Sequence, residues 1–269
     1  MNIIKFIESF TDDKLLAKTG NRRESFSQFG NMGKNLALAS IPFGLSALAN
    51  KSFAANISPT PATPIGALQL ALTLEYLEKE YYQMGLDSGV IPPSENGGRD
   101  LKVFQQIAAH ESDHVAFLIA GLGGSASANF VPKPTFDFTV GGAFNPFNDY
   151  PTFLALAQAF EDTGVRAYKG QAGNLISTPD LLTAALQIHS VEARHASEVR
   201  RLRGQKGWII RNERGGLPSA AQAVYDGEQT TVQAGYDTAA LFGVDSGSES
   251  FDEPLSTQAS VAIANLFIV

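Results

Sequence analysis

The chain has 269 residues, of which 44% are hydrophobic and 17% charged, and its formal net charge is −7. This composition predicts a folded chain with one large domain plus extensions or two small domains, and the acidic balance argues against nucleic acid as a partner. The chain contains no cysteine, which excludes disulfides, iron–sulfur clusters, thiolate zinc sites and cysteine nucleophiles.

Residues 1–56 form an N-terminal region with the features of an export signal. Arg22-Arg23 precedes an uncharged apolar run over residues 36–49, and small residues follow at Ala54-Ala55. A run of this length matches the apolar part of a signal peptide and is short for a membrane span. The twin arginine predicts Tat-type export, so that the protein is periplasmic or secreted, and we expect no integral membrane span in the mature chain.

A cytoplasmic alternative stays open for this region. Glu24 and the position of Phe26 depart from the usual Tat pattern, and Pro42 would interrupt a regular helix within the apolar run. Ile3 and Ile7 keep helical spacing, which is typical of an ordinary amphipathic helix at the start of a cytoplasmic protein.

A proline-rich linker, residues 58–64, precedes four segments with helical periodicity. We expect helices over residues 65–84, 100–122, 151–173 and 179–203. Short connections join the first helix to the second and the third to the fourth, which predicts two antiparallel hairpins. The longer segment 123–150 is rich in phenylalanine, so it should lie along the surface of the bundle. The pattern predicts an all-α four-helix bundle over residues 57–205 with one long crossover.

Residues 206–269 form a C-terminal extension. A weaker helical stretch is expected over residues 219–242, and the last residues, 261–269, are apolar. Exposing that apolar tail would create a sticky surface patch, so we expect the extension to dock on the bundle.

One short pattern occurs in both hairpins. Glu111-x-x-His114 lies in the second predicted helix, and Glu192-x-x-His195 lies in the fourth. Residues three apart on a helix lie on one face, so each pattern places a carboxylate beside an imidazole. Each of these pairs therefore supplies a carboxylate and an imidazole to one half of a dinuclear metal site.

A second pattern supplies one further carboxylate in each hairpin. Glu75 lies between Leu68 and Tyr82 on one helical stripe, and Glu161 occupies the same place between Leu154 and Tyr168. Burying a lone carboxylate is costly unless it is paired, protonated or bound to a cation. The predicted metal ligands are therefore Glu75, Glu111, His114, Glu161, Glu192 and His195.

Several neighbours of these ligands leave alternatives open. Glu78 shares part of the face of Glu75 and is its rival, whereas helical phase turns Asp162 toward solvent. Tyr82 and Tyr168 either donate hydrogen bonds to the metal-bound carboxylates or only pack at the edge of the core. The two remaining histidines are expected at the surface or behind the ligands: His110 and His189.

The chain resembles the ferritin-like superfamily, whose members with Glu-x-x-His on the second and fourth helices include rubrerythrins, bacterioferritins and manganese catalases. The segments Leu74–Tyr82, His110–His114 and Phe251–Leu255 are similar to the exported branch that also contains plant desiccation-related proteins. The resemblance covers residues 60–269. The lack of cysteine excludes the electron-transfer module of a complete rubrerythrin, and His195 separates the chain from storage ferritins.

Four carboxylates and two imidazoles suit two iron or manganese ions, with redox chemistry on dioxygen or peroxide in stress protection as the leading hypothesis. The alternative is a non-catalytic metal-binding or desiccation-protective protein of the cell envelope, and a bundle without metal is the third option. The choice between iron and manganese, the electron donor and a homo-oligomeric assembly stay open at this point.

Overall fold

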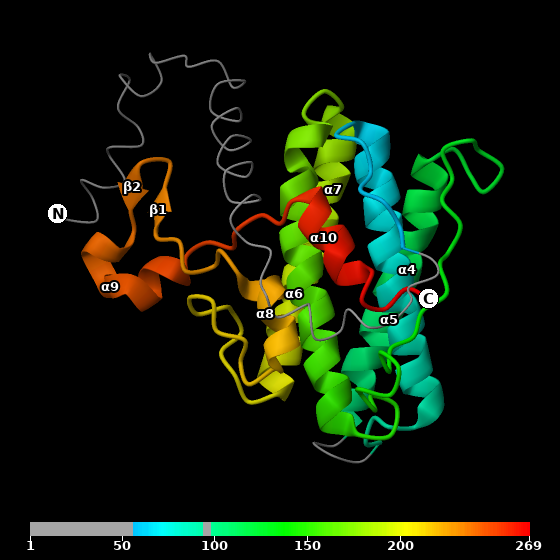
Figure 1. Ribbon diagram of the computed structural model, residues 1–269, viewed down its shortest axis with the longest axis horizontal. Coiled ribbons are helices and arrows are strands. Elements are labelled where there is room, and N and C mark those ends of the chain that lie inside the picture. Colours follow the sequence, from blue (N-terminus) through cyan, green and yellow to red (C-terminus); the bar gives the residue numbers. More distant parts are fainter. Residues whose placement is uncertain (1–55, 94–97) are drawn as a thin grey trace. The chain divides into compact units, whose positions relative to one another are not determined.

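The computed structural model describes residues 56–93 and 98–269. Four long helices form a bundle: α4 (Pro64–Ser88), α5 (Arg99–Gly121), α6 (Tyr150–Leu175) and α7 (Pro179–Leu202) (Figure 1). The all-α fold predicted from the sequence is confirmed, and each helix begins within one residue of its predicted start. The predicted signal, including Arg22-Arg23 and the apolar run, lies outside the described residues.

Local sequence signals begin and end these helices. The side chain of Thr63 accepts a hydrogen bond from the Gly66 amide ahead of α4, and the side chain of Asp149 accepts one from the Thr152 amide ahead of α6. Such side-chain caps satisfy amides that lack a partner within the helix. Gly89 ends α4 in the left-handed conformation, with φ of 72°. Among the described helices, none is long and apolar enough to cross a membrane.

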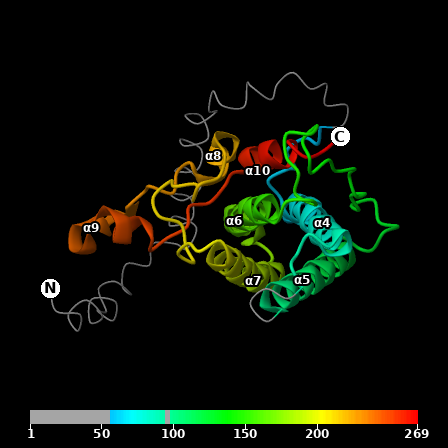
Figure 2. The ribbon, with the colours of Figure 1, turned by 90° about the horizontal axis from the view of Figure 1, so that it is seen from below.

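The helices pair as two hairpins, α4 with α5 and α6 with α7, and α4 also packs against α6. Tyr82 near the end of α4 reaches Glu161 in α6, and Tyr168 farther along α6 reaches Glu75 in α4. These crossed contacts show that α4 and α6 run antiparallel. Figure 2 looks along the bundle and shows the four helices around a common centre, with α10 (Thr257–Ala264) outside α4 and α6.

The crossover between α5 and α6 lies against the bundle, as predicted, and in addition buries some of its aromatic side chains there. Phe138 is only 2% exposed, and its ring lies 5.1 Å from that of Tyr81 in α4. The crossover also pairs with the end of the chain, because Phe136 and Ile268 form an antiparallel bridge. The chain end is therefore held between the crossover and the bundle.

The C-terminal extension is less helical than predicted. In place of a helix over residues 219–242, the chain forms a short 3-10 turn (Ser219–Ala221), α8 (Gln222–Tyr225), the hairpin strands β1 (Val232–Gln233) and β2 (Tyr236–Asp237), and the start of α9 (Ala239–Ser248). Gly227 and Gly235 explain the difference, since their φ angles of 100° and 85° are incompatible with a continuing helix.

A buried arginine joins the extension to the bundle. Arg166 of α6 is 1% exposed, donates to the backbone carbonyls of Val224, Asp226 and Glu253, and lies 2.6 Å from the carboxylate of Glu228. Its single guanidinium therefore holds two separate segments of the extension, residues 224–228 and the segment around Glu253.

The expectation that Asp162 faces solvent is wrong. Asp162 is 3% exposed and accepts hydrogen bonds from Arg200 of α7 and from the hydroxyl of Tyr225 in α8. The periodicity of α6 identified an outward face correctly, but the extension covers that face. A helical pattern alone does not reveal such a second layer of packing.

Replacing Arg166 by alanine should lower the free energy of unfolding by about 3–5 kcal/mol, because it leaves Glu228 buried without its ion pair. The matched control is Lys206→Ala, which removes an exposed pair with Glu249 at 2.7 Å and should cost about 1 kcal/mol or less. Chemical denaturation measures both values. Equal losses for the two variants would show that Arg166 does not anchor the extension.

Candidate metal centre

All six residues predicted as ligands converge at the centre of the bundle. The four carboxylates, one from each helix, are fully buried. The two imidazoles, His114 from α5 and His195 from α7, are 9% and 5% exposed. Charged groups enter a protein interior only when something there compensates for their lost hydration.

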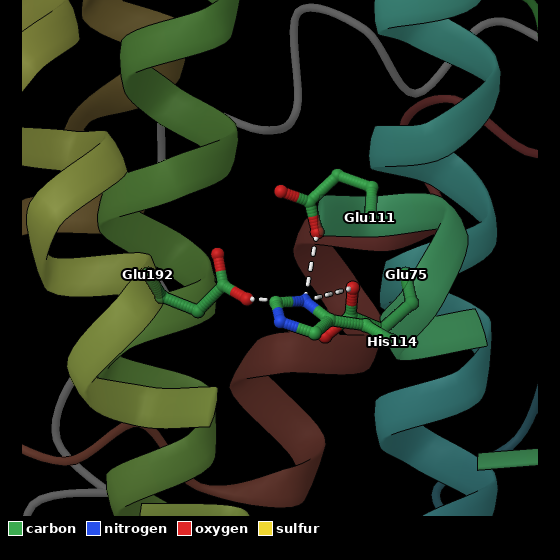
Figure 3. Close-up of side chains that lie close together, drawn as sticks. All are labelled: Glu75, Glu111, His114 and Glu192. Carbon is green, nitrogen blue, oxygen red and sulfur yellow. Dashed lines mark hydrogen bonds and ion pairs between the residues drawn. The ribbon is translucent and has the colours of Figure 1, made fainter. Parts of the chain in front are cut away.

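The first group of ligands surrounds His114. Its Nδ1 atom lies 3.2 Å from Oε2 of Glu75 and 3.1 Å from Oε2 of Glu111, its own helix neighbour. Oε1 of Glu192, from the other hairpin, lies 3.1 Å away. Figure 3 shows the three carboxylates directed at one imidazole ring from α4, α5 and α7. One ligand atom from each of these four residues fits within a space of 4.8 Å.

The second group repeats this arrangement around His195. Its Nδ1 atom lies 2.9 Å from Oε1 of Glu111, 3.3 Å from Oε2 of Glu192 and 3.4 Å from Oε2 of Glu161. Glu111 and Glu192 belong to both groups, and each directs one oxygen to each histidine. This is the placement expected of carboxylates that bridge two cations.

The cluster contains buried polar atoms that make no hydrogen bond within the protein, although they lie within ion-pair distance of one another. In the part of the chain that the structure describes, seven buried side-chain atoms lack a hydrogen-bond partner, and five of them lie here. These five are Oε1 of Glu111, Oε2 of Glu161, both carboxylate oxygens of Glu192 and Nδ1 of His195. Close approach without an aligned hydrogen bond leaves part of the desolvation cost of such atoms uncompensated, and this cost is larger for charged groups. Cations between the two groups would satisfy all five, so the residues present fit a metal pair.

Two tyrosines donate hydrogen bonds to Glu75 and Glu161, the outer carboxylates, which each belong to one group only. The hydroxyl of Tyr168 donates to Oε1 of Glu75 at 2.5 Å, and that of Tyr82 donates to Oε1 of Glu161. Each glutamate therefore keeps its other oxygen, Oε2, for the histidine of its group. Of the two interpretations of these tyrosines, the contacts match the hydrogen-bonding one.

The two other histidines differ in their relation to the cluster. His110 lies behind His195, with its Nδ1 atom 2.9 Å from Nε2 of that ring and its Nε2 atom 2.8 Å from the side-chain amide of Gln106. The Nδ1 atom of His195 is thereby left to face the carboxylates. His189 instead contacts the backbone carbonyl of Val165 and takes no part in the cluster.

Comparison with known families agrees with this geometry. The family model described as ferritin-like domain matches residues 63–205, which include all four bundle helices and all six clustered residues. The chain belongs to the ferritin-like domain family. No curated protein matches it.

One further glutamate, Glu78, is buried beside the six clustered residues. Glu78 is 3% exposed, so it accompanies Glu75 in the core instead of competing with it. It lies opposite Gly164, where a Cβ atom would come within 3.2 Å of Oε1 of Glu78 and 3.7 Å of Cγ of Glu192. Gly164 follows Glu161 by three residues, as Glu78 follows Glu75. In the sequence, the glycine at position 164, where the other hairpin has Glu78, was the feature that indicated space for this additional carboxylate.

Crowding of like charges controls the proton affinity of two carboxyls on α4. Burial raises the pKa of Glu75 well above its usual value, and the charges of Glu192 and Glu111 add to the effect. The pKa of Glu78 is raised in the same way, by burial first and then by Glu192 and Glu161. Without a cation, these two groups favour the protonated state.

The imidazoles balance part of the remaining negative charge. Burial would raise the pKa of Glu111, but its contacts with His114 and His195 outweigh burial and lower it to about 2. Burial would likewise lower the pKa of His114, but the surrounding carboxylates raise it to about 12. The metal-free cluster thus replaces cations with protons, and those protons would leave when metal binds.

The variant Glu78→Gln should alter the pH dependence of the metal-free protein. Because the folded chain raises the pKa of Glu78, wild-type stability falls as the pH increases above the usual carboxyl pKa. Glutamine cannot ionise, so the stability of the variant relative to wild type should grow with pH. Chemical denaturation at several pH values measures this difference.

The control is Glu80→Gln, on the same helix, where the carboxylate forms a partly exposed ion pair with Lys133. Parallel pH dependences for wild type and Glu78→Gln would contradict the assignment of Glu78 to the crowded cluster.

Proposed function

We propose that the cluster binds two iron or manganese ions and that the protein performs redox chemistry on dioxygen or peroxide. The observation that supports this most strongly is the shared use of Glu111 and Glu192, whose two oxygens are divided between His114 and His195. A single ion would leave half of these donor atoms without a partner. Two ions, one beside each imidazole, use them all.

The donor set favours iron or manganese. Carboxylate oxygens with one imidazole for each ion suit metals of intermediate hardness, whereas softer ions prefer thiolates, which this chain lacks. A bound pair of such ions supplies two one-electron centres, as needed for a two-electron change at an O–O bond.

The protein's own groups would orient this chemistry. Tyr82 and Tyr168 fix the outer carboxylates through hydrogen bonds, and burial raises the pKa of both hydroxyls well above the usual value, so they remain donors. His110 fixes the orientation of the His195 ring through Nε2. The packed helices keep the cluster away from bulk water, which strengthens every electrostatic contact inside it.

Metal analysis of paired double variants tests the assignment of ligands. Glu111→Ala with Glu192→Ala removes the two carboxylates that both groups share, so both ions should be lost. Glu161→Ala with His195→Ala removes the same number of ligands from one group only, so about one ion per chain should remain. The control is Asp113→Ala, an exposed position between Glu111 and His114, which should keep both ions.

Circular dichroism should show unchanged helix content in all three proteins, so that loss of metal is not confused with unfolding. Equal metal content in the two double variants would contradict the shared role of Glu111 and Glu192. The metal-loaded wild type should then consume dioxygen or peroxide. The variant without the shared carboxylates should consume them only at the background rate. A loaded protein that consumes neither oxidant would indicate metal sequestration instead.

We further propose that the protein is exported by the Tat route, as in the exported branch that it resembles. The support is the twin arginine Arg22-Arg23 ahead of the apolar run. Changing both arginines to lysine keeps the charge but should leave the protein in the cytoplasm with its N-terminus intact. Cell fractionation and N-terminal sequencing check this result, and unaltered export of the variant would refute the proposal.

A further inference from the structure

An apolar cavity lies inside one end of the bundle, where α4 and α7 begin and α5 and α6 end. All four helices contribute to its wall, including Ala71 of α4, Phe117 of α5, Tyr168 of α6 and Ala185 of α7. Phe117 is 42% exposed and Ala185 is half-buried, so these two residues mark the side that faces solvent.

The cavity offers no free polar group to a guest. Its only polar lining side chains are Tyr168 and Gln171. The Tyr168 hydroxyl donates to Glu75, while Gln171 donates to Thr257 at 3.1 Å and accepts from Asn174 at 2.8 Å. A buried water needs about two to four polar partners, so this cavity should stay dry.

The size of the cavity limits its guest to a few atoms. The volume open to the centre of a water-sized molecule is about 20 Å³. One water-sized molecule needs roughly 10–15 Å³ by this measure, so the cavity has room for about one or two such molecules. An acyl chain or an aromatic substrate therefore does not fit without rearrangement, but a diatomic gas does.

Side chains next to the metal ligands line the inner end of the cavity. Tyr168 lines the cavity and places its hydroxyl on Glu75. Leu74, which precedes Glu75, and Ile188, one helical turn before Glu192, belong to the same wall. A guest in the cavity is thus separated from the carboxylate cluster by side chains that adjoin the ligands directly.

We propose that this cavity holds dioxygen beside the metal centre, so that dioxygen and not peroxide is the oxidant of the proposed function, on which this inference rests. Dioxygen is apolar and makes no strong hydrogen bonds with water, so its transfer from water into the cavity costs little free energy. Peroxide would lose the hydrogen bonds of two hydroxyl groups in a cavity that returns none, at about 1–3 kcal/mol for each unsatisfied group.

Xenon, an apolar probe of similar size, tests the cavity independently of activity. Xenon NMR on the full-length protein should show saturable binding to the wild type. Ala185→Leu fills the solvent-facing side and should abolish this binding. The matched control is Ala184→Leu, on the neighbouring position of α7 outside the cavity wall, which should retain it.

The same proteins, loaded with metal, link the cavity to the reaction. In oxygen uptake during oxidation of ferrous iron, Ala185→Leu should raise the KM for dioxygen several-fold without lowering kcat, and Ala184→Leu should match wild type. As a second variant, Phe117→Ala widens the opening and should speed xenon exchange. Unchanged exchange, or an unchanged KM in Ala185→Leu, would overturn the inference.

Metal analysis of these samples separates the two proposals. Wild type that carries metal but shows no saturable xenon binding would overturn the dioxygen cavity alone. Wild type that binds xenon but no metal would refute the proposed function and, with it, delivery of dioxygen to a metal centre.

Discussion

The burial of negative charge at the centre of the bundle is the constraint on which the rest of this structure depends. Four fully buried carboxylates converge on two imidazoles, with Glu78 as a fifth nearby. Buried carboxylates of this kind are stable under one of three conditions: they are protonated, they pair with cationic side chains, or they bind metal. The metal-free protein uses the first two, as the shifted pKa values of Glu75 and His114 show. Both are weaker substitutes for divalent ions, which leaves a site whose electrostatics favour metal uptake.

Two similar hairpins produce this centre, but they do not produce two identical halves. Glu75 and Tyr168 form the same contact as Glu161 and Tyr82, and each histidine faces both shared carboxylates. The symmetry fails where Glu78 corresponds to Gly164, and where His110 precedes Glu111 but Val191 precedes Glu192. His195 therefore contacts the imidazole of His110, and the position that corresponds to His110 in the other hairpin holds a valine. The two ions would therefore experience different electrostatic surroundings, which is a basis for assigning them different roles.

Sequence periodicity predicted the helices and the convergence of the six clustered residues because both follow from single-helix geometry. The Glu-x-x-His spacing and the capping residues at Thr63 and Asp149 act within one or two turns. The errors concern contacts between layers. The periodicity of α6 directs Asp162 to solvent because it contains no sign that Arg200 and Tyr225 cover this residue. Periodicity also makes Glu78 a rival of Glu75, because it does not show that Gly164 leaves room for both carboxylates.

The extension that sequence periodicity described poorly also shapes access to the centre. Helix α10 packs on α4 and α6, and Ile263 and Phe267 of the chain end line a small cavity together with Glu78 and Gly164. The side of the bundle nearest the extra carboxylate is thereby covered by apolar groups. Water reaching Glu78 would lower the cost of its charge and weaken the electrostatic preference for metal. The C-terminal extension thus maintains low-dielectric surroundings that would favour cation binding by the carboxylate cluster.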